Sequence, residues 1–185
     1  VGAVFAKSLA WALKKPALGV HHLESHLMAA HLGENRMAYP YLGLLVSGGH
    51  TLLIHVKQPG LYEVVGQSLD DAVGEAFDKV AKMLDLPYPG GPAVEILARS
   101  GDSQRFTMPR PMISHSGCDL SFSGLKTHIM QLITKLNVGP SQSTCWRADV
   151  AAGFQAAVSD CLLLKTRRAL KKTGVKHVVV AGGVS

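Results

Sequence analysis

Residues 41–57 read YLGLLVSGGHTLLIHVK, and this stretch decides the expected fold. The nearly all-apolar run from Tyr41 to Ser47 predicts a strand buried on both faces. Gly48-Gly49 turns the chain, and His50 to Lys57 predicts the next strand. A third strand is expected from Tyr62 to Ser68. The chain is therefore expected to have a hairpin-based sheet at its centre.

Helical spacing of apolar residues lies on both sides of this hairpin. Helices are expected over Val1 to Lys15, His22 to Leu32, Ala72 to Leu84, Ala93 to Arg99, Ser123 to Leu136 and Ala148 to Lys172. Lys176 to Ala181 predicts a further strand, and Ala17 to Val20 a short one. Asp102 to Asp119 is expected to be irregular, and Tyr88-Pro-Gly-Gly-Pro92 to break the chain between two helices. This order of elements indicates a mixed α/β architecture.

Composition narrows the class of protein. The 185 residues are 47% apolar, enough for a sizeable core, and no apolar run is long enough to span a membrane. The net charge of +6 suits an anionic partner such as RNA. Cys118, Cys145 and Cys161 lack metal-binding spacing and favour a reduced, cytosolic compartment. Because there is no initiator Met and the chain stops after a Gly-Gly turn, we expect a fragment with both ends missing.

A histidine pair lies in the stretch HHLESH at residues 21–26. On a helix, His22 and His26 are four residues apart and share a face, so they can bind one divalent metal. A zincin protease needs a glutamate directly after the first histidine, whereas Glu24 comes two residues later. Two histidines leave room for a carboxylate from elsewhere and suit iron as well as zinc. A histidine pair with no ligand is about equally compatible with the spacing.

Glycines and acids form further candidate sites. Gly48-Gly49 lets a backbone approach a ligand and can form an anion nest, although an ordinary hairpin turn is the commoner explanation of a lone Gly-Gly pair. In the stretch DDAVGEAFDK, Asp71 can cap a helix, and a carboxylate such as Asp78 can hold ribose hydroxyls. The stretch SFSGLKT at 121–127 can offer N–H groups to phosphate or act as a plain helix cap. The glycines of VVVAGGVS at 178–185 can receive a nucleotide.

A basic cluster lies near the end of the last expected helix. Contact with tRNA phosphates and favourable charge at a helix C-terminus both explain it. Its members are Lys165, Arg167, Arg168, Lys171 and Lys172.

Five of these motifs, taken in order, resemble the bacterial branch of the tRNA N6-adenosine threonylcarbamoyltransferase family, formerly described as a glycoprotein endopeptidase. They read HHLESH, LLVSGGHT, DDAVGEAFDKVAKMLDLPYPGGP, SFSGLKT and VVVAGGVS. The resemblance implies the two-lobed α/β fold of actin, Hsp70 and sugar kinases, with a ligand cleft between the lobes. Residues 1–40 are then the last part of the first lobe with the metal-binding helix, and residues 41–185 most of the second lobe.

The resemblance also implies the site residues. His22 and His26 match the family's metal ligands, with Fe(2+) as the expected metal and zinc as an alternative. The substrate-binding segment matches Leu45, Val46, Ser47, Gly48 and Gly49, and Asp78 and Gly91 match two further nucleotide contacts. Glu95 stands where some members carry an acid. The third metal ligand and an adenosine-contacting Asn are expected outside this chain.

The implied activity is acyl transfer in the cytoplasm. The threonylcarbamoyl group of threonylcarbamoyl-AMP passes to N6 of adenosine 37 in tRNAs that read codons beginning with A, and AMP leaves. His50 lies close to the glycine turn but has no strong claim to be the general base. A paralogous protein of the same fold and a P-loop ATPase are the expected partners. The fragment alone is expected to be inactive.

Three other functions remain as alternatives. A small-molecule kinase of the same fold uses the glycine turn to hold ATP but needs no histidine pair. A non-catalytic paralogue that organises an assembly is a second alternative, and it tends to lose the metal histidines. A metalloprotease is the third, and the position of Glu24 disfavours it.

Overall fold

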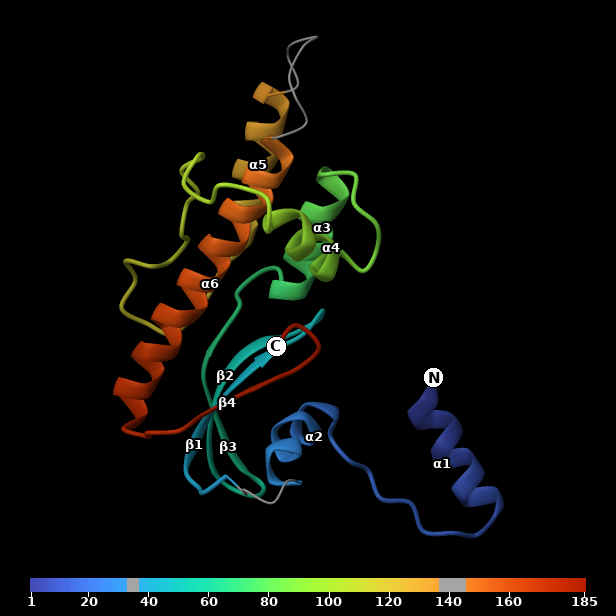
Figure 1. The fold of residues 1–185 in the computed structure, drawn as a ribbon. Helices are drawn as coiled ribbons and strands as arrows, with labels where there is room; N and C mark the ends of the chain where they lie inside the picture. The colour runs from blue at the N-terminus through green and yellow to red at the C-terminus, as the bar shows by residue number, and fades with distance from the viewer. Residues whose placement is uncertain (33–36, 137–145) are drawn as a thin grey trace.

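The computed structural model describes residues 1–32, 37–136 and 146–185. Within these residues the chain forms a four-stranded mixed sheet and six α-helices (Figure 1). The helices are α1 Gly2–Ala12, α2 His22–Met28, α3 Val73–Met83, α4 Gly90–Ala98, α5 Ser123–Leu136 and α6 Trp146–Thr173, with the short 3-10 helix η1 Ala29–His31. The strands are β1 Tyr41–Val46, β2 Thr51–Gln58, β3 Leu61–Gln67 and β4 Val178–Ala181. The mixed α/β prediction is confirmed, and the architecture is consistent with a piece of the expected actin-like fold.

The sheet has the strand order β3-β2-β1-β4. β1 pairs antiparallel with β2 and parallel with β4, so β1 lies between its hairpin partner and the last strand of the chain. All six residues of β1 are buried. The all-apolar run therefore forms a strand covered on both faces, as the sequence predicts.

The residues of β1 alternate between two hydrophobic clusters because successive side chains of a strand point to opposite faces. Leu42, Leu44 and Val46 join the larger cluster with α3, α5 and α6. Tyr41 joins a smaller cluster that includes Leu27 of α2. The helix α2 thus covers the face of the sheet opposite to α3 and α6.

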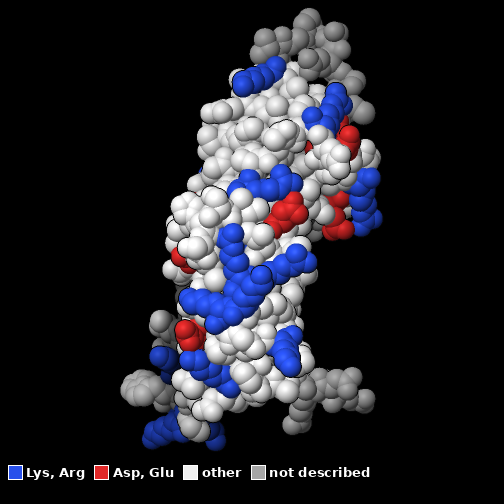
Figure 2. Space-filling view, turned by 90° about the vertical axis from the view of Figure 1, so that its left-hand side faces the viewer, with Lys and Arg blue, Asp and Glu red and all other residues white. Residues whose placement is uncertain are grey.

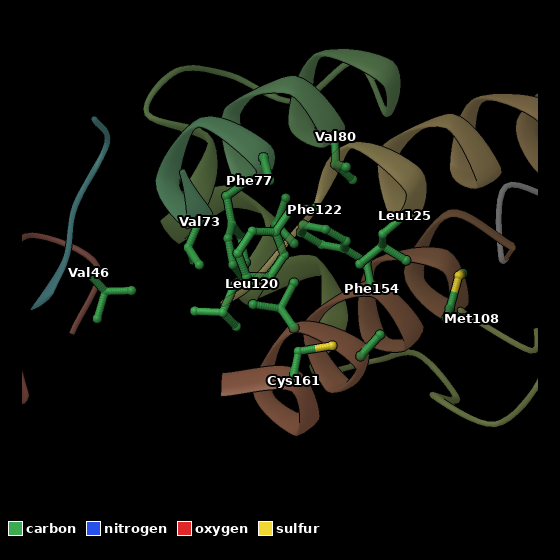
Figure 3. Close-up of a cluster of buried hydrophobic side chains, with 14 of the residues drawn as sticks. Val46, Val73, Phe77, Val80, Met108, Leu120, Phe122, Leu125, Phe154 and Cys161 are labelled. Carbon is green, nitrogen blue, oxygen red and sulfur yellow. The ribbon is translucent and has the colours of Figure 1, made fainter. Parts of the chain in front are cut away.

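Aromatic side chains fill the middle of the larger cluster. Figure 3 shows Phe77, Phe122, Leu125 and Phe154 pointing toward one another from α3, α5, α6 and the segment before α5. The rings of Phe77 and Phe154 meet edge to face with centroids 4.8 Å apart. This packing fixes α3 against α6, and both helices contribute to the site described below.

The first helix, α1, lies apart from the rest of the chain beside the N-terminus (Figure 1). None of its residues is buried, and Trp11 is 84% exposed. In the described part of the chain, no helix combines the length and hydropathy that a membrane crossing requires.

Two predicted boundaries are wrong. Residues 17–20 form no strand, and Leu18 is 90% exposed, because four apolar residues without a neighbouring strand gain no ladder hydrogen bonds. The expected break at Tyr88 to Pro92 ends early, since Gly90, Gly91 and Pro92 form the first turn of α4. Proline is tolerated there because the first N–H groups of a helix have no partner within it.

The start of α6 is held by a buried aspartate. Asp149 is 6% exposed and accepts hydrogen bonds of 2.6 Å from the Asp102 N–H and from Arg105 Nη1. The Asp102 N–H lowers the pKa of Asp149; burial opposes this shift, and Arg105 adds to it.

Stability is expected to depend on Asp149 at acid pH. The pKa of an aspartate in the unfolded chain is about 3.9. Since the pKa of Asp149 is lower in the folded protein, its stabilising contribution is complete above pH ~4 and is lost as the pH falls through its folded value. In the whole protein, Asp149→Asn should lower the free energy of unfolding at pH 7 by about 1–3 kcal/mol and reduce its dependence on pH below ~4.

Urea denaturation at several pH values measures this effect. The control is Asp160→Asn, because Asp160 pairs with Arg110 at the surface and should contribute less than about 1 kcal/mol. Equal effects of the two substitutions at pH 7 would contradict the role given to Asp149.

Candidate functional site

The predicted tight connection between β1 and β2 is confirmed. The N–H of Ser47 donates to the carbonyl of His50 at 2.9 Å, and the N–H of His50 donates back to Ser47 Oγ at 3.0 Å. Gly48 and Gly49 lie between them and are exposed. The turn therefore presents two glycines to the surface at the end of a fully buried strand.

The N-terminus of α3 rests on this turn. The Gly74 N–H donates to the Ser47 carbonyl at 3.2 Å, and the Val73 N–H donates to Thr51 Oγ1 at 2.9 Å. A Cβ at Gly74 would lie 2.8 Å from Gly48 Cα, so only glycine fits there without movement of backbone. The β1–β2 turn thus supplies hydrogen-bond acceptors to the first turn of α3.

The predicted helix cap at Asp71 is wrong. Ala72 occupies the N-cap position, and no side chain caps the helix there. The Asp71 carboxylate instead accepts hydrogen bonds from Lys79 at 2.6 Å and from Lys126 at 3.0 Å. Asp71 therefore ties α3 to α5, because the β1–β2 turn already satisfies the helix N–H groups that a cap would satisfy.

The N-terminus of α4 meets α3 through Asp78. Asp78 Oδ1 accepts the Gly90 N–H at 2.7 Å. A Cβ at Gly90 would lie 2.7 Å from the Cα of Asp78, whereas a Cβ at Gly91 would meet no atom within 4 Å. One glycine therefore allows close packing of the two helices, and the next leaves open space in front of α4.

A cavity of about 520 Å³ lies between the end of β1, the helices α3, α4 and α6, and the residues after β4. It brings together Val46, Gly48, Asp78 and Gly91 from the predicted substrate-binding set, and also Glu95. Its volume is in the range that small-molecule ligands occupy.

Three residues of the predicted set do not line this cavity. They are Leu45, Ser47 and Gly49. Leu45 is fully buried, and its side chain points to the face of the sheet opposite to Val46. Ser47 instead closes the turn, and Gly49 is exposed on it.

The far wall of the cavity contains residues that sequence reasoning missed. Gln155 and Ser159 from α6 line it, as do Gly183, Val184 and Ser185. Of the two glycines after β4 that are expected to receive a nucleotide, Gly183 lies in this wall and Gly182 does not. No sequence pattern marks Gln155 or Ser159 as site residues, because single polar residues in a long helix usually face water.

The histidine pair adopts the predicted helical geometry. His22 and His26 lie on α2 with ring centroids 4.6 Å apart. The Glu24 carboxylate accepts a hydrogen bond from the Tyr62 hydroxyl on β3, so it is engaged elsewhere. Neither histidine is among the residues that line the cavity.

The donor set of this pair fits part of a metal site. Two imidazoles at this spacing can bind one divalent ion. Across residues 1–32, 37–136 and 146–185, no three His, Cys, Asp or Glu side chains are grouped as a metal site.

Comparison with known proteins identifies the family. The family model described as TsaD, tRNA N6-adenosine threonylcarbamoyltransferase, matches residues 1–185. The chain belongs to this family. A protein of that name from Dichelobacter nodosus is 56% identical over 184 residues, covering 100% of this chain and 53% of the relative. One from Vesicomyosocius okutanii is 54% identical over 185 residues, covering 100% of this chain and 52% of the relative. The chain spans about half the length of the curated relatives it matches.

The SFSGLKT motif of this TsaD-family chain is occupied by a carboxylate. Asp70 accepts hydrogen bonds from the Phe122 N–H at 2.8 Å and from the Ser121 and Ser123 hydroxyls at 2.5 and 2.7 Å. Burial would raise the pKa of Asp70, but these hydrogen bonds outweigh it and lower the pKa. The Asp70 carboxylate thus binds the N–H and hydroxyl groups that the motif was expected to offer to a phosphate. This favours a structural role for the motif over phosphate binding.

The basic cluster on α6 divides into two groups. Lys165 is 1% exposed and donates to the carbonyls of His115 and Gly117 at 3.1 and 2.8 Å. Burial lowers its pKa, and the nearby charge of Arg168 adds to the shift. Arg168 also donates to the carbonyls of Ile113 and His115. The prediction that Lys165 contacts tRNA is therefore wrong, because the 113–117 loop uses its ammonium group.

The other members of the cluster, Arg167, Lys171 and Lys172, are exposed. Figure 2 shows Lys and Arg side chains gathered on the side of the molecule that includes α6, with few acidic side chains among them. In this TsaD-family chain, Arg167, Lys171 and Lys172 are accessible to a partner, and their contact with tRNA phosphates stays a prediction.

We expect Gly74→Ala to disturb the turn. The added methyl group would meet backbone atoms of Ser47 and Gly48, and backbone cannot yield as a flexible side chain can. In the whole protein, the free energy of unfolding should fall by about 1–3 kcal/mol, and binding of AMP, measured by calorimetry, should weaken.

The matched control is Gly124→Ala. Gly124 is the second residue of α5, as Gly74 is of α3, but a Cβ there would have its nearest neighbour at 3.8 Å. Because alanine favours helix, this control should gain up to about 1 kcal/mol. A Gly74→Ala protein as stable as the control would show that the contact is not tight.

Proposed function

We propose that the whole protein to which this chain belongs transfers the threonylcarbamoyl group of threonylcarbamoyl-AMP to N6 of adenosine 37 in tRNAs that read codons beginning with A. The family match over residues 1–185 carries this proposal, since both relatives bear the name of that activity. The cavity supports it, because four predicted substrate-binding residues line one space.

The charge of the cavity suits the nucleoside part of the adenylate. Asp78 and Glu95 line it, and no Lys or Arg side chain is among its described lining residues. Ribose hydroxyls can donate to these carboxylates, whereas a phosphate would be repelled by them. Since Asp78 Oδ1 holds the Gly90 N–H, its second oxygen is the better acceptor for a ribose.

We propose that the phosphate of the adenylate binds at the β1–β2 turn. Gly48 lies at the edge of the cavity, and Gly48 and Gly49 are exposed with open space in front of them. Backbone N–H groups without side chains nearby can hold an anion closely. In this arrangement, the acyl phosphate leaves the cavity at the end of β1.

His22 and His26 would hold a divalent metal, with iron as the first choice and zinc as the second. When bound, such an ion polarises a carbonyl and orients the group that is transferred. The two imidazoles supply part of its ligand set, and the rest of the whole protein supplies the remainder. The metal-bearing helix α2 is fixed to the sheet by the buried Leu27 and by the Glu24–Tyr62 hydrogen bond.

The transfer itself forms one bond and breaks one. The N6 amine of the adenosine attacks the carbamoyl carbon, and a C–N bond forms. The bond from that carbon to the phosphate oxygen breaks, AMP leaves with the electron pair, and the amine proton passes to solvent. The chain's own residues hold the AMP portion, so the leaving group stays fixed while the tRNA base approaches. The target base must be unstacked, as in an RNA loop.

The assembly and location follow the same proposal. We propose a paralogous protein of the same fold and a P-loop ATPase as partners, and the cytoplasm as the compartment. Cys118 and Cys161 are free and buried, and a reducing compartment suits them.

The deciding experiment incubates the whole protein and its partners with threonylcarbamoyl-AMP and tRNA. Mass spectrometry of the digested tRNA should show threonylcarbamoyl-adenosine, and AMP should appear in equal amount. Transfer of phosphate from ATP to a small molecule, with no modified tRNA, would instead support a kinase of the same fold.

A further inference from the structure

Gln155 has an unsatisfied polar atom at the wall of the cavity. Its side chain lines the cavity from α6, yet Oε1 is buried and has no hydrogen-bond partner among the described residues. His55 Nε2 and Thr166 Oγ1 are also buried without a described partner, but neither residue lines the cavity. Among the described residues, Gln155 alone combines a missing hydrogen-bond partner with a place in the cavity wall.

A buried acceptor without a donor is uncommon, because its desolvation is not offset by a hydrogen bond. The last torsion of a glutamine side chain is soft, so the amide can turn and present Oε1 to the cavity. A ligand with an N–H group at this wall would then satisfy it. The cavity wall around Gln155 is otherwise partly apolar, with Val158 and Leu162 on the same helix, and such a surface suits the flat face of a base.

The two walls of the cavity differ in chemistry. Asp78 and Glu95 come from α3 and α4, and Gln155 comes from α6. If the carboxylates take the ribose hydroxyls, the base of the same nucleoside faces the other wall. A glutamine amide matches adenine well, since it can accept from the exocyclic amine and donate to a ring nitrogen.

We infer that Gln155 reads the base of the bound nucleotide, with Oε1 accepting a hydrogen bond from the exocyclic amine of adenine. The inference rests on the proposed function, because that function places an adenylate in this cavity. It assigns Gln155 to base selection and not to the chemical step. The role requires an acceptor at this position, so glutamate should preserve it and methionine, of similar length, should not.

The test compares AMP with purine riboside monophosphate, which carries hydrogen in place of the amine. Calorimetry on the whole wild-type protein should show AMP binding about 10-fold more tightly than purine riboside monophosphate, as expected for one hydrogen bond. In Gln155→Met, AMP should bind about 10-fold more weakly, and its preference over purine riboside monophosphate should be lost. In Gln155→Glu, the preference for AMP should remain.

Gln131→Met is the matched control, because Gln131 is exposed on α5 and does not line the cavity. It should keep the wild-type preference. Equal binding of both nucleotides by the wild-type protein would overturn the inference without any variant. An unchanged preference in Gln155→Met would overturn it as well. Absence of both AMP binding and tRNA modification in the wild-type protein would instead contradict the proposed function.

Discussion

Replacing His26 by alanine in the whole protein is expected to remove bound divalent metal and to slow single-turnover transfer by at least about 100-fold. His22→Ala should have the same effect. The two rings lie 4.6 Å apart on α2, so each is placed to contribute one ligand to a shared ion. A site that loses one of few protein ligands cannot hold a divalent ion against water.

Binding of tRNA should change little in the same variants. RNA affinity comes mainly from Lys and Arg contacts to phosphates, and it falls as salt rises. Neither histidine is needed for such contacts, whereas exposed residues such as Arg167, Lys171 and Lys172 can make them. The experiment therefore pairs metal analysis and single-turnover transfer with tRNA binding at several salt concentrations.

His21→Ala is the matched control, since His21 is an exposed neighbour of the pair and its side chain makes no capping hydrogen bond at the start of α2. It should keep both metal and activity. Full transfer by a metal-free protein that lacks both His22 and His26 would show these histidines to be structural.

The part of the fold that the sequence predicts best is the part set by local pattern. The apolar run of β1 and the glycine turn after it appear where expected. A strand buried on both faces is a continuous apolar segment, which is easy to recognise in a sequence. The helical face shared by His22 and His26 also follows from spacing alone.

The wrong predictions concern interactions between distant segments. Asp71 has the residue type of a helix cap and directly precedes the expected helix, but Ala72 is the N-cap, and Thr51 and Ser47, far away in sequence, accept hydrogen bonds from the helix N–H groups. Lys165 has the sequence context of a solvated charge, but the 113–117 loop folds over it and accepts its hydrogen bonds. Gln155 is one polar residue in a long helix, and only tertiary packing turns it toward a cavity.

The close approach of β4 to β1 provides the other large expected effect. Gly182 follows β4 with φ of +113°, and a Cβ there would lie 2.1 Å from the Val46 carbonyl oxygen. The same oxygen accepts the Val184 N–H at 3.2 Å. Val46 and Val184 both line the cavity, so this contact shapes the site as well as the sheet.

Gly182→Ala should lower the free energy of unfolding of the whole protein by about 3 kcal/mol or more. Two causes act together: the backbone conformation disfavours any side chain, and the methyl group would meet a backbone oxygen that is fixed in β1. Gly183→Ala is the matched control for stability, because a Cβ at Gly183 would meet no atom within 4 Å. Urea denaturation should show the control within about 1 kcal/mol of wild type. AMP binding should weaken in Gly182→Ala, since separating the chain after β4 from Val46 opens the cavity wall. Equal stability of the two variants would mean that β4 approaches β1 less closely than the structure indicates.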